Sequence, residues 1–253
     1  HTGPAVTLAF TVAAIGCALA AICYAELAAL IPVAGSAYSY TYATLGEGVA
    51  WFVGWNLALE YMMSAATVAV GWSGYVVNLL EEFGMHLPAA LVNAPVGKTA
   101  EHTLAATGAI VNLPAVLIVV ALTWLCYIGI RQSASLNNLM VIVKVAIIVL
   151  FIVIGVSFVD TSLWHPYLPA NTGEFGHFGL SGVMQGAAII YFAYIGFDTA
   201  ATTAQEARNP QRDVPAGIMG ALVISTVLYV AMGAVMTGMV DYTKLDVAAP
   251  VAV

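Results

Sequence analysis

The sequence predicts an all-α polytopic membrane protein, and its composition is the first reason. Of its 253 residues, 62% are hydrophobic and only 8% are charged, whereas charged residues make up about 25% of an ordinary soluble domain. Six apolar runs are long enough to cross a bilayer as helices, which takes about 20 residues each. A transmembrane β-barrel would instead show alternating segments of about ten residues, and the sequence has none. Helices are therefore expected, because a helix satisfies its own backbone hydrogen bonds in lipid.

The six expected helices follow one another along one transmembrane domain, with no soluble domain between them. They lie near residues 5–30, 50–79, 113–130, 138–158, 182–205 and 216–239. Residues 80–112 form the longest connection, which contains the helix-breaking sequences HLP and NAP. Residues 31–49 are rich in Gly, Ser and Tyr, too polar to span a bilayer and too apolar for a free linker. This connection is either a re-entrant or interfacial segment or an ordinary belt of interfacial tyrosines.

Composition and motifs exclude several classes of function. The net charge is −7 and the six Lys and Arg residues are scattered, so no nucleic-acid partner is expected. The three cysteines lie in apolar runs without a CxxC or Cys/His pairing, so neither a metal site nor a disulfide framework is expected. No HExxH or GxSxG motif occurs, and we expect neither an enzyme nor a cofactor. The chain begins at His1 without a charged segment before an apolar run, so no signal peptide is expected.

The basic residues indicate an orientation in the membrane. Arg131 lies between the third and fourth runs, and Arg208 and Arg212 lie between the fifth and sixth. These connections fall on one side, which is expected to be cytoplasmic by the positive-inside rule. Lys98 and Lys244 fall on the other side, among several acidic residues. The N-terminus of the chain is therefore expected outside.

Four ionisable residues lie inside the apolar runs or at their edges: Glu26, Glu60, Lys144 and Asp198. A charge at the middle of a bilayer costs about 2.5–3.5 kcal/mol even on the lenient insertion scale, so each should face protein or water. Glu26 stands near the end of its run, where a structural role is favoured. Glu60 lies one turn after Asn56, which favours a helix–helix contact. Four isolated charges do not supply the continuous polar lining of a channel.

Lys144 is the only charge in the run 138–158. Burial disfavours the ammonium form, so a lysine in such a run can load and release a proton near neutral pH. The other interpretation is an ammonium that holds helices together through neighbouring carbonyl groups. Both interpretations expect the side chain to face the protein interior.

The stretch YFAYIGFD, residues 191–198, places a glycine and a carboxylate inside an apolar run. In a continuous helix Gly196 would cost about 1 kcal/mol relative to alanine, and Asp198 would cost more in lipid. Transporters place such residues where a helix is interrupted, so that unwound backbone groups face a cavity. A discontinuous helix at about 182–205 is therefore expected, with a kinked helix and a packing glycine as the alternative.

Five separated motifs carry a resemblance to a known family. They are CYAELAALIPVAGSAYSYTYATLGE, WFVGWNLALEY, NNLMVIVK, FAYIGFD and EARNPQRDVP. Together they resemble the amino acid–polyamine–organocation superfamily, and most of all its cationic amino acid transporter branch. The resemblance runs along essentially the whole chain and implies a fold of two inverted five-helix repeats, with helices one and six broken. The six runs then match helices two to seven, so the chain is expected to be a fragment that does not transport by itself.

The resemblance also implies a function. Such proteins move amino acids across the cell membrane by alternating access, usually coupled to protons, so the expected partners are an amino acid, a proton and the lipid bilayer. A sensor or receptor that keeps this fold and binds an amino acid without moving it is the alternative.

The resemblance assigns substrate-binding roles to four residues. Phe192 matches the aromatic outer gate over the substrate. Ile195, Gly196 and Phe197 match the broken segment whose carbonyl groups receive the α-amino group of the substrate.

Two further residues match positions linked to ion coupling. Asp198 matches an acidic position just beyond the break, which relatives link to the site or its gating. Lys144 matches the helix-five lysine of proton-coupled relatives, which occupies the place that a sodium ion takes in sodium-coupled ones.

Overall fold

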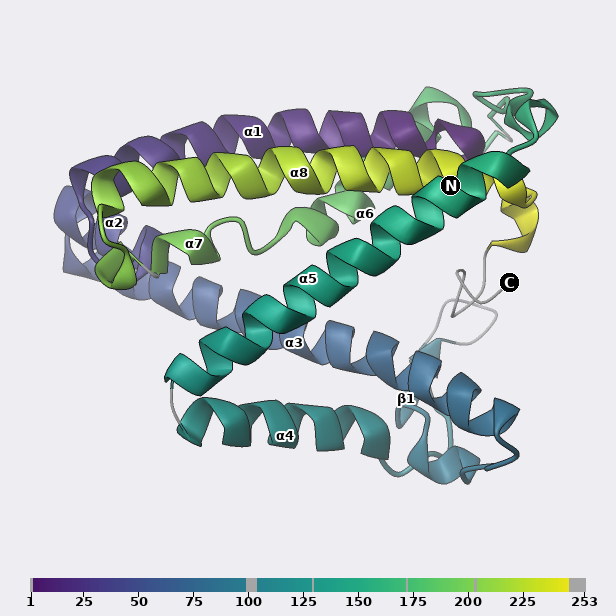
Figure 1. Ribbon diagram of the computed structural model, residues 1–253, viewed down its shortest axis with the longest axis horizontal. Coiled ribbons are helices and arrows are strands. Elements are labelled where there is room, and N and C mark those ends of the chain that lie inside the picture. The colour runs from purple at the N-terminus through teal and green to yellow at the C-terminus, as the bar shows by residue number, and fades with distance from the viewer. Residues whose placement is uncertain (1, 99–103, 129, 172, 203, 246–253) are drawn as a thin grey trace. The chain divides into compact units, whose positions relative to one another are not determined.

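The computed structural model describes residues 2–98, 104–128, 130–171, 173–202 and 204–245. They divide into two compact units, the first within His1–Leu57 and Lys144–Asp246 and the second within Ala58–Val143. Apart from loops, the secondary structure of these described residues is helical, with one small hairpin (Figure 1). The expected all-α polytopic fold, with its discontinuous helix, is confirmed.

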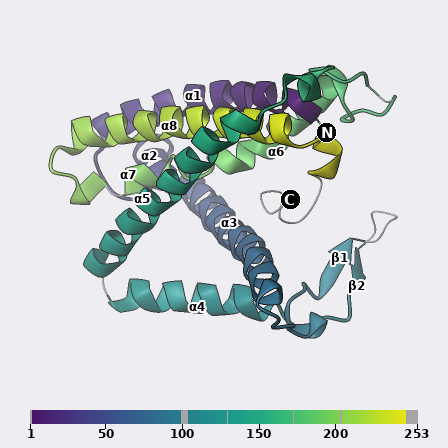
Figure 2. The same ribbon diagram turned by 45° about the vertical axis from the view of Figure 1, so that its right-hand side comes forward.

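Eight α-helices are present in the described residues. They are α1 (Val6–Leu30), α2 (Ser36–Leu45), α3 (Glu47–Glu82), α4 (Leu113–Ile128), α5 (Ile130–Gly155), α6 (Gly179–Tyr194), α7 (Thr199–Thr202) and α8 (Pro210–Met239). The short 3-10 helices are η1 (Gly3–Ala5), η2 (Ala89–Leu91), η3 (Val156–Phe158), η4 (Thr161–Trp164), η5 (Ala204–Glu206) and η6 (Tyr242–Lys244). Strands β1 (Val96–Lys98) and β2 (Leu104–Ala106) pair antiparallel, with Val96 opposite Ala106 (Figure 2).

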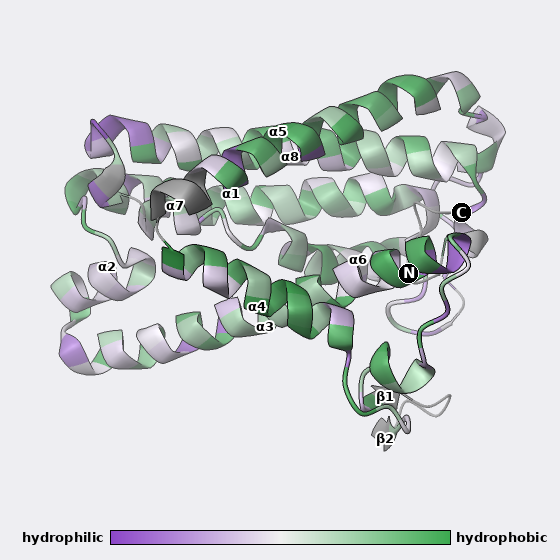
Figure 3. Ribbon diagram, turned by 60° about the horizontal axis from the view of Figure 1, so that its bottom comes forward, coloured by the Kyte–Doolittle hydropathy of each residue, from purple (hydrophilic) through white to green (hydrophobic). Residues whose placement is uncertain are grey.

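Five helical segments of the described chain are long and apolar enough to cross a membrane. They are Gly3–Leu30, Glu47–Glu82, Ser135–Phe158, Gly179–Thr202 and Pro210–Met239. The third expected span is the shorter apolar helix α4, with 16 residues. Hydrophobic residues recur along these helices (Figure 3). Only 6% of the apolar window within Ser135–Phe158 is buried inside the protein. Such exposed apolar surface needs lipid around it, so the chain is a multi-pass membrane protein.

Helix α8 begins six residues earlier than the expected start at residue 216, at Pro210. Proline suits a first helical turn, because the N–H that it lacks would have no partner there. The Asp213 carboxylate accepts the Asn209 backbone N–H at 3.1 Å, which fastens the first turn. The first turns of α8 contain polar residues, so a prediction based on apolar runs did not include these turns.

A stripe of small residues that begins at Ala5 in η1 and continues along α1 runs through the core of the first unit. Ala5, Ala9, Ala13, Cys17 and Ala21 recur every fourth residue, and none is more than 5% exposed. Residues at this spacing share one face of a helix. This face packs against α6 and α8, and α1 and α8 lie side by side along their length (Figure 1). Small side chains let the helix backbones approach closely, which drives helix association in membranes.

Helix α6 carries a glycine, Gly186, where it packs against this stripe. A Cβ atom built on Gly186 would overlap Cγ2 of Thr2 and would lie 3.5 Å from the Cβ of Ala9. The absent side chain is what lets α6 lie this close to the start of α1.

The connection 31–49 contains helix α2, which with 10 residues is too short to cross a membrane. Ser36 and Tyr40 on this helix are buried, whereas Tyr38 and Tyr42 are 41% and 52% exposed. Helix α2 packs against α1 and α7. The tyrosines are therefore not a uniform interfacial belt, because one of them belongs to the core.

The second unit is organised around a buried polar contact. The Asn112 side chain donates from Nδ2 to Ser73 Oγ on α3 at 2.8 Å. Its Oδ1 accepts the Ala115 backbone N–H at 3.2 Å, in the first turn of α4. One amide side chain thus caps α4 and fixes the start of that helix beside α3.

We expect Gly186→Ala to destabilise the protein by about 1–3 kcal/mol, because the added methyl group meets the side chain of Thr2. Gly16→Ala is the matched control, since this α1 glycine has nothing within 4 Å of an added Cβ. The control should be neutral or stabilising by up to about 1 kcal/mol. Thermal unfolding in lipid nanodiscs measures both, and equal shifts for the two variants would contradict the close packing.

Candidate functional site

The candidate site is the interruption between α6 and α7. Helix α6 ends at Tyr194, α7 begins at Thr199, and the backbone between them is not helical (Figure 1). Ile195 turns extended with ψ 132°, and Gly196 has φ +114°. Side chains with a Cβ atom rarely adopt such a positive φ, so the glycine permits the break.

The break leaves backbone carbonyl groups without donors. The Phe192 carbonyl accepts the Ile195 N–H at 3.3 Å, and the Gly196 carbonyl accepts the Thr199 N–H at 3.1 Å. The Thr199 hydroxyl also donates to Gly196, at 2.5 Å. Among the described residues, no donor reaches the carbonyl oxygens of Tyr194, Ile195 or Phe197. A backbone carbonyl is a strong hydrogen-bond acceptor, so these oxygens suit a ligand that donates hydrogen bonds, such as an ammonium group.

Two tyrosines anchor the end of α6, and the sequence did not reveal either role. The Tyr194 hydroxyl donates to the Phe10 carbonyl on α1 at 3.3 Å. The Tyr229 hydroxyl of α8 donates to the Ala193 carbonyl at 3.1 Å, which gives that group the partner it loses at the break. The two rings meet edge to face with centroids 5.4 Å apart. The sequence offered one signal for Tyr194, which stands two residues before Gly196, the glycine that permits the break. A phenol that is buried at such a place needs a hydrogen-bond partner.

The aromatic side chains of the break take different directions. The Phe197 ring lies edge to face on Tyr24 of α1, with centroids 5.7 Å apart. Tyr24 in turn meets Tyr40 of α2 at 6.2 Å. Phe192, in the last turn of α6, is 40% exposed. The ring of Phe197 thus packs on Tyr24, while its carbonyl oxygen has no donor among the described residues. The ring of Phe192 is exposed one turn before the break.

The two residues expected to couple ions lie in different surroundings. Asp198 ends the break and is only 6% exposed. Its backbone carbonyl accepts the Ala201 N–H at 2.9 Å and the Ser36 hydroxyl at 3.4 Å. Lys144 lies on α5 with an exposed side chain, and no salt bridge joins it to another described residue. Residues 195–198 are consecutive in the broken segment, and Phe192 precedes them in the last turn of α6. Lys144 lies on a separate helix, α5.

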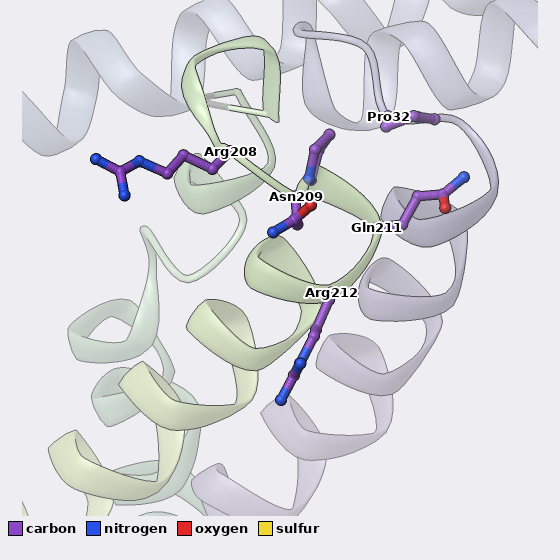
Figure 4. A pocket seen from close by; sticks show the side chains of 6 residues that line it. Pro32, Arg208, Asn209, Gln211 and Arg212 are labelled. Carbon is purple, nitrogen blue, oxygen red and sulfur yellow. The ribbon is translucent and has the colours of Figure 1, made fainter.

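A hollow of about 510 Å³ lies away from the break, where the α1–α2 connection faces the start of α8. Its lining residues are Pro32, Arg208, Asn209, Pro210, Gln211 and Arg212 (Figure 4). The arginine side chains are exposed and point in different directions (Figure 4). The hollow is an open, basic surface at one end of the first unit and does not include the open carbonyl groups.

Within the part of the chain that the structure describes, no group of three or more His, Cys, Asp or Glu residues could hold a metal ion. The chemistry of the site is therefore that of backbone groups, one buried carboxylate and aromatic rings.

We expect Gly196→Ala to destabilise the break by about 1–3 kcal/mol, because alanine is strained at a φ of +114°. No atom lies within 4 Å of an added Cβ, so the effect comes from the backbone alone. Gly74→Ala is the control, since this glycine has equally open surroundings and no positive φ. Thermal unfolding compares the two, and a Gly196→Ala variant as stable as the control would show that the break does not need this conformation.

Comparison with known proteins gives the site its context. A family model described as amino acid permease matches residues 1–250. A methylthioribose transporter of Bacillus subtilis (strain 168) is 45% identical over 98% of this chain and 50% of its own length. A branched-chain amino acid permease of the same organism is 44% identical over 96% of this chain and 49% of its own length.

A vacuolar cationic amino acid transporter of Arabidopsis thaliana is 40% identical over 99% of this chain and 40% of its own length. The chain thus spans 40 to 50% of the length of these three relatives. All three are named as transporters or permeases, in agreement with the expectation that the chain is not an enzyme.

Proposed function

Because the chain belongs to the amino acid permease family, we propose that it forms part of a secondary transporter that moves amino acids by alternating access. The observation that carries the proposal is the break in the α6–α7 span, which leaves the carbonyl oxygens of Ile195 and Phe197 without a donor among the described residues. Discontinuous helices with this property form the substrate sites of many secondary transporters.

The substrate ammonium binds at the open carbonyl groups. The oxygens of Ile195 and Phe197 have no donor among the described residues and supply this half of the site. Gly196 contributes its conformation more than its carbonyl, because Thr199 already donates to that oxygen. Phe192 closes over the bound substrate with its exposed ring. Backbone groups recognise the part that all amino acids share, so they do not choose between side chains.

Lys144 couples transport to protons in this proposal. An exposed ammonium in an apolar helix is costly in lipid, so the side chain must meet protein or water in the working transporter. The relatives are about twice as long as this chain. In this proposal, segments beyond the present chain supply such a surface. Asp198, buried just beyond the break, links the state of the site to the movement of α7.

In the full-length protein, Lys144→Ala is expected to abolish the dependence of amino acid uptake on a pH gradient. Lys144→Arg is the matched variant, because arginine keeps the charge and does not release a proton. Both variants should lose proton dependence in proteoliposomes, while binding to the open carbonyl groups persists. Proton-dependent uptake at the wild-type level in Lys144→Ala would remove the coupling role.

The end of the first unit that carries α2, α7 and the start of α8 is cytoplasmic in this proposal, and the protein resides in the cell membrane. Arg208 and Arg212 lie at that end, in agreement with the positive-inside rule. The connection between α5 and α6 is then outside, together with the N-terminus of the chain.

A cysteine scan tests this orientation. In intact cells that express the full-length protein, a membrane-impermeant maleimide should label Thr161→Cys above the parent level and should leave Gln211→Cys unlabelled. Both positions are exposed, so access to the reagent depends on the side of the membrane. The reverse pattern of labelling would invert the orientation.

A further inference from the structure

We propose that α2 is a latch that positions α7 and the helix break, with Ser36 and Tyr40 as its positioning residues. These two residues lie one turn apart on α2, and both are buried. Helix α2 packs against α7, which begins directly after the break. Neither residue touches the open carbonyl groups, so each acts through the segments that it holds.

Ser36 fastens α2 to the break through a backbone group. It is 1% exposed, and its hydroxyl donates to the Asp198 carbonyl at 3.4 Å. Ser36 also has φ +51°, which is uncommon for a residue other than glycine. Backbone strain of this kind persists only where the surrounding structure enforces it, and it gathers at gates and switches. The contact is therefore maintained against a local conformational preference.

Tyr40 fastens the same helix through its ring. Its contact with Tyr24, and that of Tyr24 with Phe197, form one chain of edge-to-face rings from α2 to the break. Tyr40 is 3% exposed, and no described residue offers its hydroxyl a hydrogen bond. A buried hydroxyl without a partner opposes the packing that buries it. The ring therefore favours the docked position of α2, whereas the hydroxyl favours release into water.

Together these features describe a contact close to balance between two positions. The ring chain and the packing of α2 on α7 hold the latch closed, while the strained Ser36 and the Tyr40 hydroxyl favour opening. The hollow between Pro32 and the start of α8 leaves the connection before α2 open on that side (Figure 4). Packed elements with two discrete arrangements are what switching between states requires.

The latch deepens the proposed function and rests on it for its role in transport. Helix α7 continues from the break, so its position sets the direction of the open Ile195 and Phe197 carbonyl groups. Release of α2 would free α7 and open the site toward the end of the unit that carries α2. Docking of α2 would close that route.

Two substitutions of Tyr40 should act in opposite directions. Tyr40→Phe removes only the unpaired hydroxyl, so it should favour the docked state and slow amide hydrogen exchange in residues 36–45 and 199–202 by about fivefold. Tyr40→Ala removes the ring and should speed exchange in both segments by about tenfold or more. Tyr42→Phe and Tyr42→Ala are the matched controls, because Tyr42 lies on the same helix and is 52% exposed. They should leave exchange in 199–202 unchanged.

The measurement uses the full-length protein in lipid nanodiscs, followed by mass spectrometry. An ordinary packing role would make Tyr40→Phe neutral or slightly destabilising, so unchanged or faster exchange in that variant would overturn the latch. Faster exchange of α2 alone in Tyr40→Ala, with α7 unaffected, would overturn it as well. Ser36→Ala, which removes the hydroxyl bound to Asp198, should speed exchange in 199–202 even if Tyr40→Ala fails to fold.

Uptake separates this proposal from the transport function. Tyr40→Phe should lower the maximal rate of amino acid uptake more than it changes KM, because it stabilises one state of the cycle. Wild-type protein that takes up no amino acid would count against the proposed function, whereas the exchange data would still decide whether α2 holds α7.

Discussion

A helix that stops inside a bilayer must find partners for the backbone groups that it frees, and most features of the first unit follow from this constraint. Lipid offers no hydrogen bonds, so each freed carbonyl oxygen needs a protein donor, water or a ligand. Tyr229 supplies a donor to Ala193, and Thr199 supplies two to Gly196. Among the residues that the structure describes near the break, the carbonyl oxygens of Tyr194, Ile195 and Phe197 remain without a donor. The site is polar because Tyr229 and Thr199 pair only some of the freed carbonyl groups and leave the others without a donor.

The small residues of α1 make this arrangement possible. With alanine or cysteine at every fourth position, α1 lies close enough to α6 and α8 for tyrosine hydroxyls to cross between helices. Bulkier side chains on the stripe would hold the helices apart, and Tyr194 would then lose the Phe10 carbonyl as its acceptor. Helix packing and backbone hydrogen bonding therefore depend on each other in this unit. The distance between the helices decides which donors reach the broken segment.

The sequence predicted the break but not what holds it. Gly196 and Asp198 stand out because their chemistry conflicts with a continuous span in lipid, and the interruption lies where they are. The packing of Tyr40 could not be predicted in the same way. Tyr38, Tyr40 and Tyr42 are equivalent by type and position in the sequence, and only the approach of α1 and α7 makes one of them a core residue.

The start of α8 was misplaced for a related reason. An apolar run in the sequence indicates only the part of a helix that contacts lipid. A helix whose first turns are polar therefore begins before the apolar run begins. Lys144 is exposed on α5, whereas the sequence led us to expect a side chain that faces the protein interior. The chain spans about half the length of its relatives, so the sequence of α5 alone could not define the surroundings of this side chain.

The open oxygens at Ile195 and Phe197 have a consequence for how such proteins change over evolutionary time. A main-chain carbonyl has no codon of its own, so replacement of the side chain at either position leaves the acceptor in place. In the proposed site, mutation can therefore change the side chains around a substrate while the backbone acceptors for its ammonium group remain. A recognition element made of backbone is resistant to mutation, and that resistance leaves the side chains around the proposed site free to diversify.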